Sequence, residues 1–267
     1  RVDVIRHLSA AAECRDNNTG MHLLRMARYA VAIGEVVGLT SEELEHLLVC
    51  APMHDVGKIG IPDSILLKAG SLEASEMEIM KSHTSNGERL LDGESSLMRA
   101  AREIAVGHHE RWDGLGYPHG LAGDSIPLFA RICAVADVFD ALTTVRPYKP
   151  SWSINDAANW IRQQSGTLFD PQLAAAFDIA LPKIMLIRDL YCDDIDPHKI
   201  SALSKTVREA PEYIRWSDDL SVHIDMIDQH HKHLVDLIND LYNVVTHQHG
   251  LHDVLRILRA LKQYAEV

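Results

Sequence analysis

Long hydrophobic runs are missing from this sequence of 267 residues. No stretch of about 18 consecutive apolar residues occurs, so we expect no transmembrane helix in this chain. The sequence also lacks the basic and then apolar N-terminal pattern of a signal peptide. It begins at Arg1, and we expect it to be a piece of a longer cytoplasmic protein.

Cysteine and basic residues are also few. The four cysteines lie far apart and form no C-x-x-C pair, which disfavours a disulfide framework or a cysteine zinc site: Cys14, Cys50, Cys133 and Cys192. We expect reduced core cysteines of a cytosolic protein. The 26 Lys and Arg residues stand against 38 Asp and Glu, a net charge of −12. This excess disfavours general binding of DNA or RNA, although a local positive site could hold one small anion.

Apolar residues recur at helical spacing along almost the whole chain, which predicts an all-α fold. Residues 128–142 are apolar nearly all round and predict a buried helix. Residues 113–127 are rich in Gly and Pro and predict a loop, with a short hairpin as an option. The other predicted helices include one that ends near Gly38, one that begins at Thr40 and Ser41, and those over about 75–91, 96–108, 153–164 and 171–187.

Histidine is abundant, with 16 residues, and it is the commonest metal ligand in proteins. Several histidines share an apolar helical stripe or end a predicted helix. Asp137 lies within the most apolar predicted helix, and no Lys or Arg stands three or four residues from it. A buried carboxylate is costly unless it is paired or bound to a cation. We therefore expect a shared metal site built from His22, His54, Asp55, His83, His108, His109 and Asp137.

Two of these ligand pairs are adjacent in the sequence. Neighbouring residues on a helix point about 100° apart, so His54-Asp55 and His108-His109 can converge only where a helix ends or distorts. Glycines follow both pairs, which fits such distortions. Imidazole and carboxylate ligands together suit iron or manganese, and also zinc or nickel.

Residues 54–58 (HDVGK) resemble the signature of the HD metal-dependent phosphohydrolases. Residues 108–118 (HHERWDGLGYP) resemble the hallmark of the HD-GYP subfamily, and further matching runs are 59–68, 130–142 and 146–149. The resemblance covers about residues 1–185. It implies an all-α HD-domain helical bundle with a Gly/Pro-rich GYP loop.

The resemblance also implies an activity, the hydrolysis of cyclic di-GMP to pGpG or on to GMP by a hydroxide that bridges two divalent metal ions, iron or manganese. The first metal's ligands would be His22, His54, Asp55 and Asp137, and the second metal's would be His83, His108 and His109, with Asp55 bridging both. Asp55 and Lys58 would be catalytic. The substrate would contact Arg111 and Tyr117 in the pocket wall, and Arg146 and Lys149 at its phosphates.

Two positions depart from the family pattern. Some members carry a glutamate where this chain has Asn18, and that glutamate binds a third metal. Because an amide is a weaker ligand than a carboxylate, we expect two metals and not three. Leu115 stands where the family has a small polar residue.

The C-terminal part has a different character. Residues 189–215 are polar and predict a linker after a catalytic domain over 1–188. Residues 216–240 resemble the opening of bacterial hemerythrin domains, with His231 at an iron-ligand position. The unit over 216–267 would be an incomplete two-helix fragment that offers one ligand and builds no di-iron site.

Two alternatives to the phosphodiesterase stay open. One is another HD phosphohydrolase that acts on mononucleotides, which the GYP loop and residues 146–149 argue against. The other is a catalytically weak or silent module that senses a cyclic dinucleotide or contacts a protein. The oligomeric state is also open, with a homodimer as one option.

Overall fold

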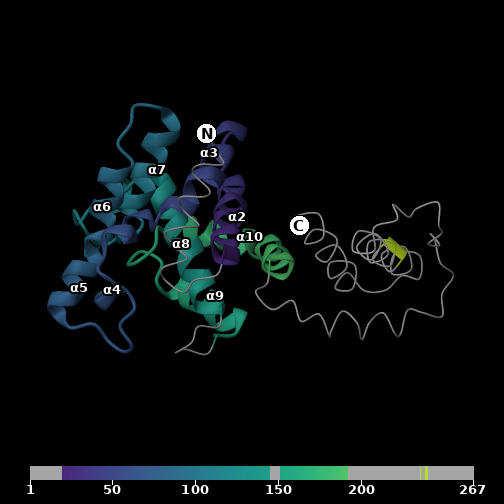
Figure 1. Cartoon of the computed structure of the whole chain (residues 1–267). Coiled ribbons are helices and arrows are strands. Elements are labelled where there is room, and N and C mark those ends of the chain that lie inside the picture. Colours follow the sequence, from purple (N-terminus) through teal and green to yellow (C-terminus); the bar gives the residue numbers. More distant parts are fainter. Residues whose placement is uncertain (1–19, 145–150, 192–234, 236–237, 240–267) are drawn as a thin grey trace, which may run out of the picture. The chain divides into compact units, whose positions relative to one another are not determined.

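The computed structural model describes residues 20–144, 151–191, 235 and 238–239. By contact density the chain divides into two units, residues 1–187 and 188–267, and the first holds nearly all the described residues. Every regular element described is helical, which confirms the all-α prediction for this part (Figure 1). Among the described residues, no helix is both long and apolar enough to cross a bilayer.

The helix bounds follow local signals in the sequence. Helix α2 (Gly20–Val36) ends just before Gly38, whose φ of 82° suits glycine. Helix α3 (Ser41–Cys50) begins at a capping box, in which Thr40 accepts a hydrogen bond from the Glu43 backbone N–H and Glu43 accepts one from that of Thr40. The elements that follow are η1 (Ala51–Met53), η2 (Val56–Gly60), α4 (Asp63–Leu66), α5 (Ala74–Lys81), α6 (His83–Leu90) and α7 (Ser96–Gly107).

The single helix predicted over about 75–91 is wrong, because the chain breaks at Ser82 into α5 and α6. Three side chains donate hydrogen bonds to the last carbonyls of α5: Ser82 to Ile79, His83 to Met80 and Thr84 to Lys81. Side-chain donors of this kind compete with the backbone N–H groups that would continue the helix. The break turns His83 into the first residue of a new helix.

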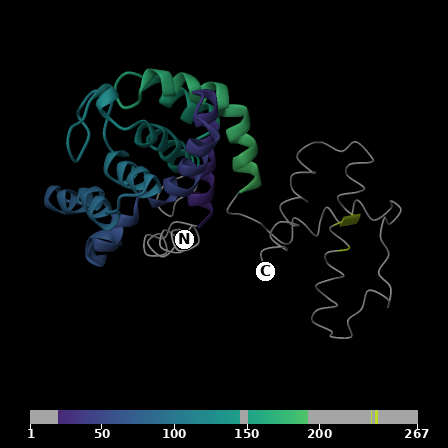
Figure 2. The same ribbon diagram turned by 90° about the horizontal axis from the view of Figure 1, so that it is seen from above.

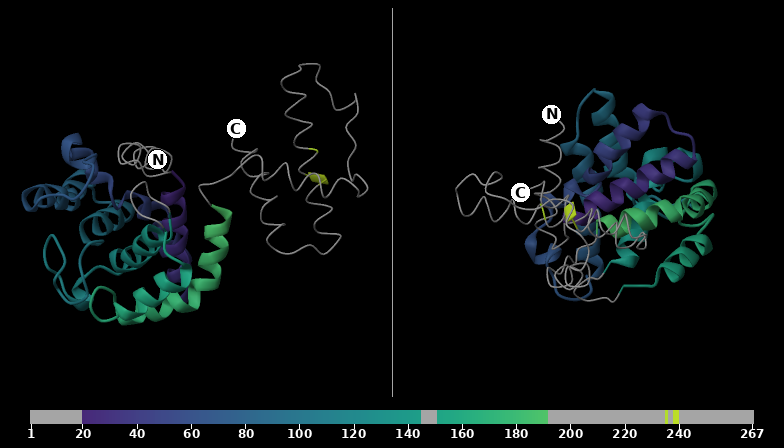
Figure 3. Two further views of the ribbon diagram at one scale, coloured as in Figure 1. Left: turned by 90° about the horizontal axis from the view of Figure 1, so that it is seen from below. Right: turned by 90° about the vertical axis from the view of Figure 1, so that its right-hand side faces the viewer.

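Helix α8 (Leu128–Thr143) is the centre of the first unit and is buried along most of its length, as its composition predicts. It packs against α2, α7 and α9 (Ile154–Gln163). The ring of Phe139 lies between Tyr29 of α2 and Phe177 of α10 (Pro171–Leu190). Helices α2 and α10 lie side by side (Figure 2), and Lys183 donates a hydrogen bond to Glu35 between them. Helix α5 lies on the opposite side of this unit (Figure 3).

The Gly/Pro-rich segment after α7 is a loop, as predicted, but the hairpin option is wrong. Between Glu110 and Leu128 the described backbone contains one short 3₁₀ segment, η3 (Gly123–Ser125), and no strand. Glu110 is buried, and its carboxylate accepts hydrogen bonds from the backbone N–H groups of His119 and Leu121. In a hairpin these N–H groups would bond to a paired strand, and here the Glu110 carboxylate accepts them instead.

Candidate metal centre

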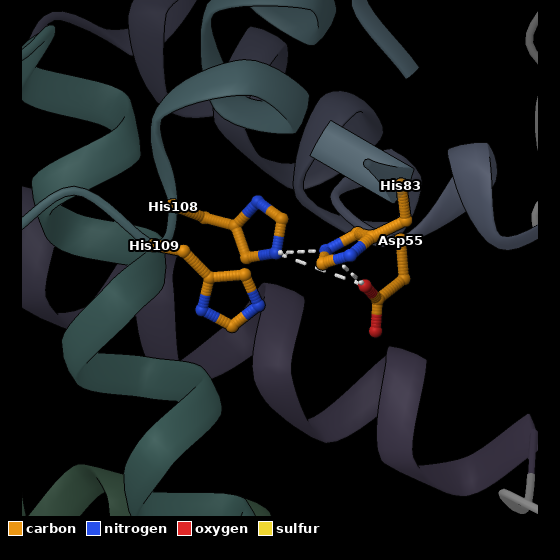
Figure 4. Close-up of side chains that lie close together, drawn as sticks. All are labelled: Asp55, His83, His108 and His109. Atoms are coloured by element: carbon orange, nitrogen blue, oxygen red, sulfur yellow. Dashed lines mark hydrogen bonds and ion pairs between the residues drawn. The ribbon is translucent and has the colours of Figure 1, made fainter. Parts of the chain in front are cut away.

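The seven predicted metal ligands all lie within the described residues, and the fold brings them together. They form two groups in which the ligand atoms lie within 4.8 Å of one another. One group is His22, His54 and Asp137. The other is Asp55, His83, His108 and His109 (Figure 4).

The adjacent ligand pairs converge because the helices end there. His54 and Asp55 lie between the 3₁₀ segments η1 and η2, and His108 and His109 lie just past the end of α7. Gly57 follows the first pair, and a Cβ at this position would lie 1.9 Å from the His83 carbonyl oxygen. Glycine at 57 thus allows η2 to approach the start of α6 and brings Asp55 close to His83.

Four imidazoles share one feature, an oxygen atom within hydrogen-bond distance of Nδ1. The Nδ1 atoms of His54, His83 and His108 lie 3.0, 2.7 and 3.1 Å from the carbonyl oxygens of Ala51, Met80 and Ile104. The Nδ1 atom of His22 lies 2.8 Å from Asp140 Oδ2. Because carbonyl and carboxylate oxygens accept and do not donate, each Nδ1 carries the hydrogen. In the neutral ring Nε2 then carries a free lone pair, and this tautomer can bind a metal through Nε2.

The Nε2 atoms of these histidines point toward one another and carry no hydrogen to donate. The Nε2 atoms of His83 and His108 lie 3.4 Å apart, and they lie 3.3 and 3.7 Å from Asp55 Oδ1. That buried oxygen has no hydrogen-bond partner. Acceptors that face one another at such distances repel unless a cation lies between them, so the donor set fits a divalent metal ion.

Asp55 belongs to the second group and also faces His54 of the first. While Oδ1 faces His83 and His108, Oδ2 lies 3.2 Å from His54 Nε2 and 2.8 Å from Lys58 Nζ. Burial alone would raise the pKa of Asp55, but the nearby ammonium of Lys58 opposes this, and the pKa lies well below its usual range. Asp55 is therefore an ionised carboxylate with one oxygen directed to each group.

His83 should make the metal-free protein sensitive to acid. Burial lowers the pKa of His83 from its ordinary 6.5 to about 4. Between these values the unfolded chain binds a proton that the folded chain does not, so stability should fall as pH falls, by up to about 3 kcal/mol. Urea unfolding of the metal-free chain at pH 7, 6 and 5 measures this. The His83→Gln variant should show a shallower slope, and equal slopes would contradict the prediction.

A cavity of about 340 Å³ adjoins the second group. His109 and Tyr117 both line it, and their rings stack with centroids 4.8 Å apart. Its lining includes the charged residues Lys81, Glu110 and Arg111 and several apolar residues, among them Leu115, Ala134, Val138 and Phe169. A pocket with apolar walls and a few charged groups suits an organic ligand.

The residues predicted to contact substrate are only partly within the described chain. Tyr117 and Arg111 line the cavity, although the Arg111 guanidinium binds Asp113 at 3.0 and 2.6 Å within the same loop. Arg146, Lys149 and Asn18 lie outside the described residues, as do Cys14, Cys192 and most of the C-terminal segment with His231. Cys50 and Cys133 are buried free thiols, as predicted for core cysteines.

The sequence reasoning missed Asp140 and Arg25. Asp140 is 1% exposed, and Arg25 donates to both of its oxygens. Burial would raise the pKa of Asp140, but the hydrogen bonds from His22 and Arg25 lower it overall. A signal was present, since a second carboxylate follows Asp137 by one helical turn on the same apolar helix.

Comparison with known protein families agrees with the helical fold and the clustered imidazoles. A family model described as HD domain matches residues 6–173, which is more than half of the chain. The chain therefore belongs to the HD domain family.

Its relatives include enzymes of known name. The chain is 47% identical over 175 residues to the cyclic di-GMP phosphodiesterase response regulator RpfG of Xanthomonas campestris, covering 65% of this chain and 46% of RpfG. It is 43% identical over 172 residues to 3′3′-cGAMP-specific phosphodiesterase 2 of Vibrio cholerae, covering 64% and 33% of the two chains. The chain thus spans less than half the length of these relatives.

A solved structure shares the fold. The crystal structure of a cyclic GMP-AMP-specific phosphodiesterase of V. cholerae matches with a TM-score of 0.54 at 18% identity, covering 100% of this chain and 70% of that one. An HDGYP protein of Bdellovibrio bacteriovorus matches with a TM-score of 0.51, also at 18% identity, covering 68% and 65%. At this identity both matches concern the fold alone.

Proposed function

We propose that this chain is an HD-GYP phosphodiesterase that hydrolyses cyclic di-GMP through a centre of two divalent metal ions, iron or manganese. The observation that carries the proposal is the position of Asp55, with one oxygen directed to each of two groups of metal-binding side chains. The names of the relatives direct the choice of substrate to cyclic dinucleotides.

In this proposal His22, His54, Asp55 and Asp137 hold one metal, and Asp55, His83, His108 and His109 hold the other. A pair of divalent ions held there would supply an activated water near neutral pH and would offset charge on the phosphate oxygens. The protein contributes the geometry. Hydrogen bonds to Nδ1 fix the imidazole rings before substrate arrives, so little reorganisation is needed at the moment of reaction.

Among the described residues, Lys58 is a cation placed directly beside Asp55, where it could assist the phosphate. Its ammonium lies 2.8 Å from Asp55 Oδ2, so a phosphate held beside Asp55 is within its reach. We assign Lys58 the roles of adding positive charge at the scissile phosphate and of giving a proton to the leaving ribose oxygen. Tyr117 keeps its proton, since burial raises its pKa, and it serves with Arg111 as wall of the pocket.

Turnover of three substrates by the whole chain tests the proposal. The chain is loaded with Mn²⁺ or, without oxygen, with Fe²⁺ and is given cyclic di-GMP, 3′3′-cGAMP or a nucleoside monophosphate. We expect hydrolysis of cyclic di-GMP, with pGpG and GMP resolved by chromatography. Hydrolysis of the monophosphate alone would favour another HD phosphohydrolase. Binding of cyclic di-GMP without hydrolysis would favour a sensor module.

Arg146 and Lys149 should act mainly on substrate binding. If they hold substrate phosphates in the ground state and transition state alike, the Arg146→Ala/Lys149→Ala double variant should raise KM roughly tenfold or more with little change in kcat. Steady-state kinetics with cyclic di-GMP measure both constants. An unchanged KM would mean that the two residues form a solvated surface pair.

The C-terminal segment has a proposal of its own. We infer that residues 189–215 are a linker after the catalytic domain over 1–188 and that residues 216–267 are an incomplete hemerythrin-like unit. Because one iron ligand, His231, is offered there, we expect the whole chain to bind no metal beyond the two of the catalytic centre.

A further inference from the structure

Helices α2 and α8 pack together, and each brings two polar residues one turn apart to their contact. His22 and Arg25 come from α2, and Asp137 and Asp140 come from α8. His22 Nε2 lies 3.6 Å from Asp137 Oδ1, on the side of the proposed metal. Asp140 and Arg25 lie on the other side of the His22 ring, away from the metal groups.

Asp140 is surrounded by donors. Its Oδ1 accepts from Arg25 Nε at 2.7 Å, and its Oδ2 accepts from Arg25 Nη2 at 3.0 Å and from His22 Nδ1 at 2.8 Å. Thr144 donates a longer bond of 3.3 Å to the same Oδ2. A guanidinium that binds both oxygens holds a carboxylate in one orientation. The orientation of Asp140 therefore depends on Arg25, and the orientation of His22 depends on Asp140.

His22 differs in this respect from the other three imidazoles with a described Nδ1 partner. His54, His83 and His108 donate to backbone carbonyls, which are fixed by the helices and turns themselves. The Nδ1 partner of His22 is a side chain. One ligand in the His22–His54–Asp137 group thus depends on a carboxylate that a single substitution can change, whereas His54, His83 and His108 are held by backbone carbonyls.

We propose that Asp140, held by Arg25, is a positioning residue that fixes the tautomer and ring orientation of His22 and so sets the metal affinity of the His22–His54–Asp137 group alone. This inference rests on the two-metal centre of the proposed function. Partners of metal-bound histidines commonly change metal affinity 10- to 100-fold when they are replaced.

The Asp140→Asn variant separates positioning from mere packing because it keeps the shape of the side chain. If the amide oxygen accepts from His22, the amide nitrogen must face Arg25, and two donors then oppose each other. If the amide nitrogen donates to His22 Nδ1, the hydrogen moves to Nε2 and blocks that ligand atom. Either arrangement weakens the metal site without leaving a cavity.

Manganese binding to the metal-free whole chain measures the effect without any substrate. Chelator competition gives the affinities, and electron paramagnetic resonance separates a spin-coupled pair from isolated ions. We expect two ions in the wild type. In Asp140→Asn we expect one site unchanged and the other about 10- to 100-fold weaker, with an isolated-ion spectrum at intermediate loading.

Asp170→Asn is the matched control. Asp170 is also buried and binds an arginine, with its Oδ2 2.7 Å from Arg131 Nη1, and it lies outside both metal groups. This variant should lose stability and still bind two coupled ions. If it lost one site as Asp140→Asn does, the effect would come from general loosening and the inference would be overturned.

Several other results of the manganese-binding experiment would also overturn the inference about Asp140. A folded Asp140→Asn that binds both ions as the wild type does, or that weakens both sites equally, overturns the inference and leaves the metal centre standing. A wild-type chain that binds no manganese overturns both. Should Asp140→Asn not fold, Arg25→Lys keeps the charge and loses the two-point contact, and we expect a smaller weakening of the same single site. Unchanged binding in that variant overturns the inference.

Discussion

Replacing Asp55 with alanine is expected to remove both metal ions and to lower the turnover of cyclic di-GMP by roughly 10³-fold or more. The reason is geometric. Oδ1 faces His83 and His108, and Oδ2 faces His54, so the loss of one side chain takes a ligand from both groups. Elemental analysis of the purified variant and a product assay with added Mn²⁺ measure the two effects.

Asp92→Ala is a suitable control for this experiment. Asp92 also carries a carboxylate, but its side chain is 87% exposed and lies outside both metal groups. It should keep its metal content and activity. An Asp55→Ala protein that turns over cyclic di-GMP without metal would refute the proposed mechanism. An Asp55→Ala protein that keeps one ion firmly bound would show that the two groups do not both depend on Asp55.

Replacing Gly57 with alanine should have the largest effect on stability. A Cβ at residue 57 would lie 1.9 Å from the His83 carbonyl oxygen and 2.4 Å from the backbone nitrogen of Gly87. Because both neighbours are backbone atoms of α6, the contact is relieved only if η2 and α6 move apart. Overpacking of this kind costs about 1–3 kcal/mol and sometimes more, and we expect the upper end. Urea unfolding of the metal-free protein measures it.

Gly60→Ala provides the comparison within the same 3₁₀ segment. A Cβ there would meet the side-chain amide of Asn86 at 2.9 Å, and this flexible group can move aside. We expect a change of less than about 1 kcal/mol and full metal binding. If Gly57→Ala were equally mild and still bound two metals, the close approach of η2 to α6 would not be needed to place His83.

Local signals in the sequence account for much of the fold. The apolar composition of residues 128–142 indicated a buried helix, and α8 is one. Thr40 indicated a helix start, and it forms a capping box with Glu43. The break at Ser82 was not predicted, because the apolar spacing continues across it. The helix ends there because three side chains donate hydrogen bonds to the last carbonyl oxygens of α5.

Pairs that are distant in the sequence were harder to foresee. Arg25 and Asp140 are 115 residues apart, and neither has an ionic partner within a helical turn of its own chain segment that would reveal the pairing. Asp137 could be selected as a metal ligand because a carboxylate on an apolar helix needs a cation. The same argument applies to Asp140, whose cation is a guanidinium from α2. The sequence does not say which carboxylate takes which cation.

The residue types and their local spacing determined by themselves that the described chain is helical, that seven side chains are of the metal-binding kind, and that the loop after His109 is irregular. These follow from interactions within a few residues, such as helical periodicity and capping. The tertiary structure alone decided that the seven side chains form two groups and that Asp55 faces both of them. It also decided that one imidazole is held by Asp140 and three by backbone carbonyls. Those features depend on contacts between helices far apart in sequence, where the packing of α2 on α8 and of η2 on α6 sets which polar atoms meet.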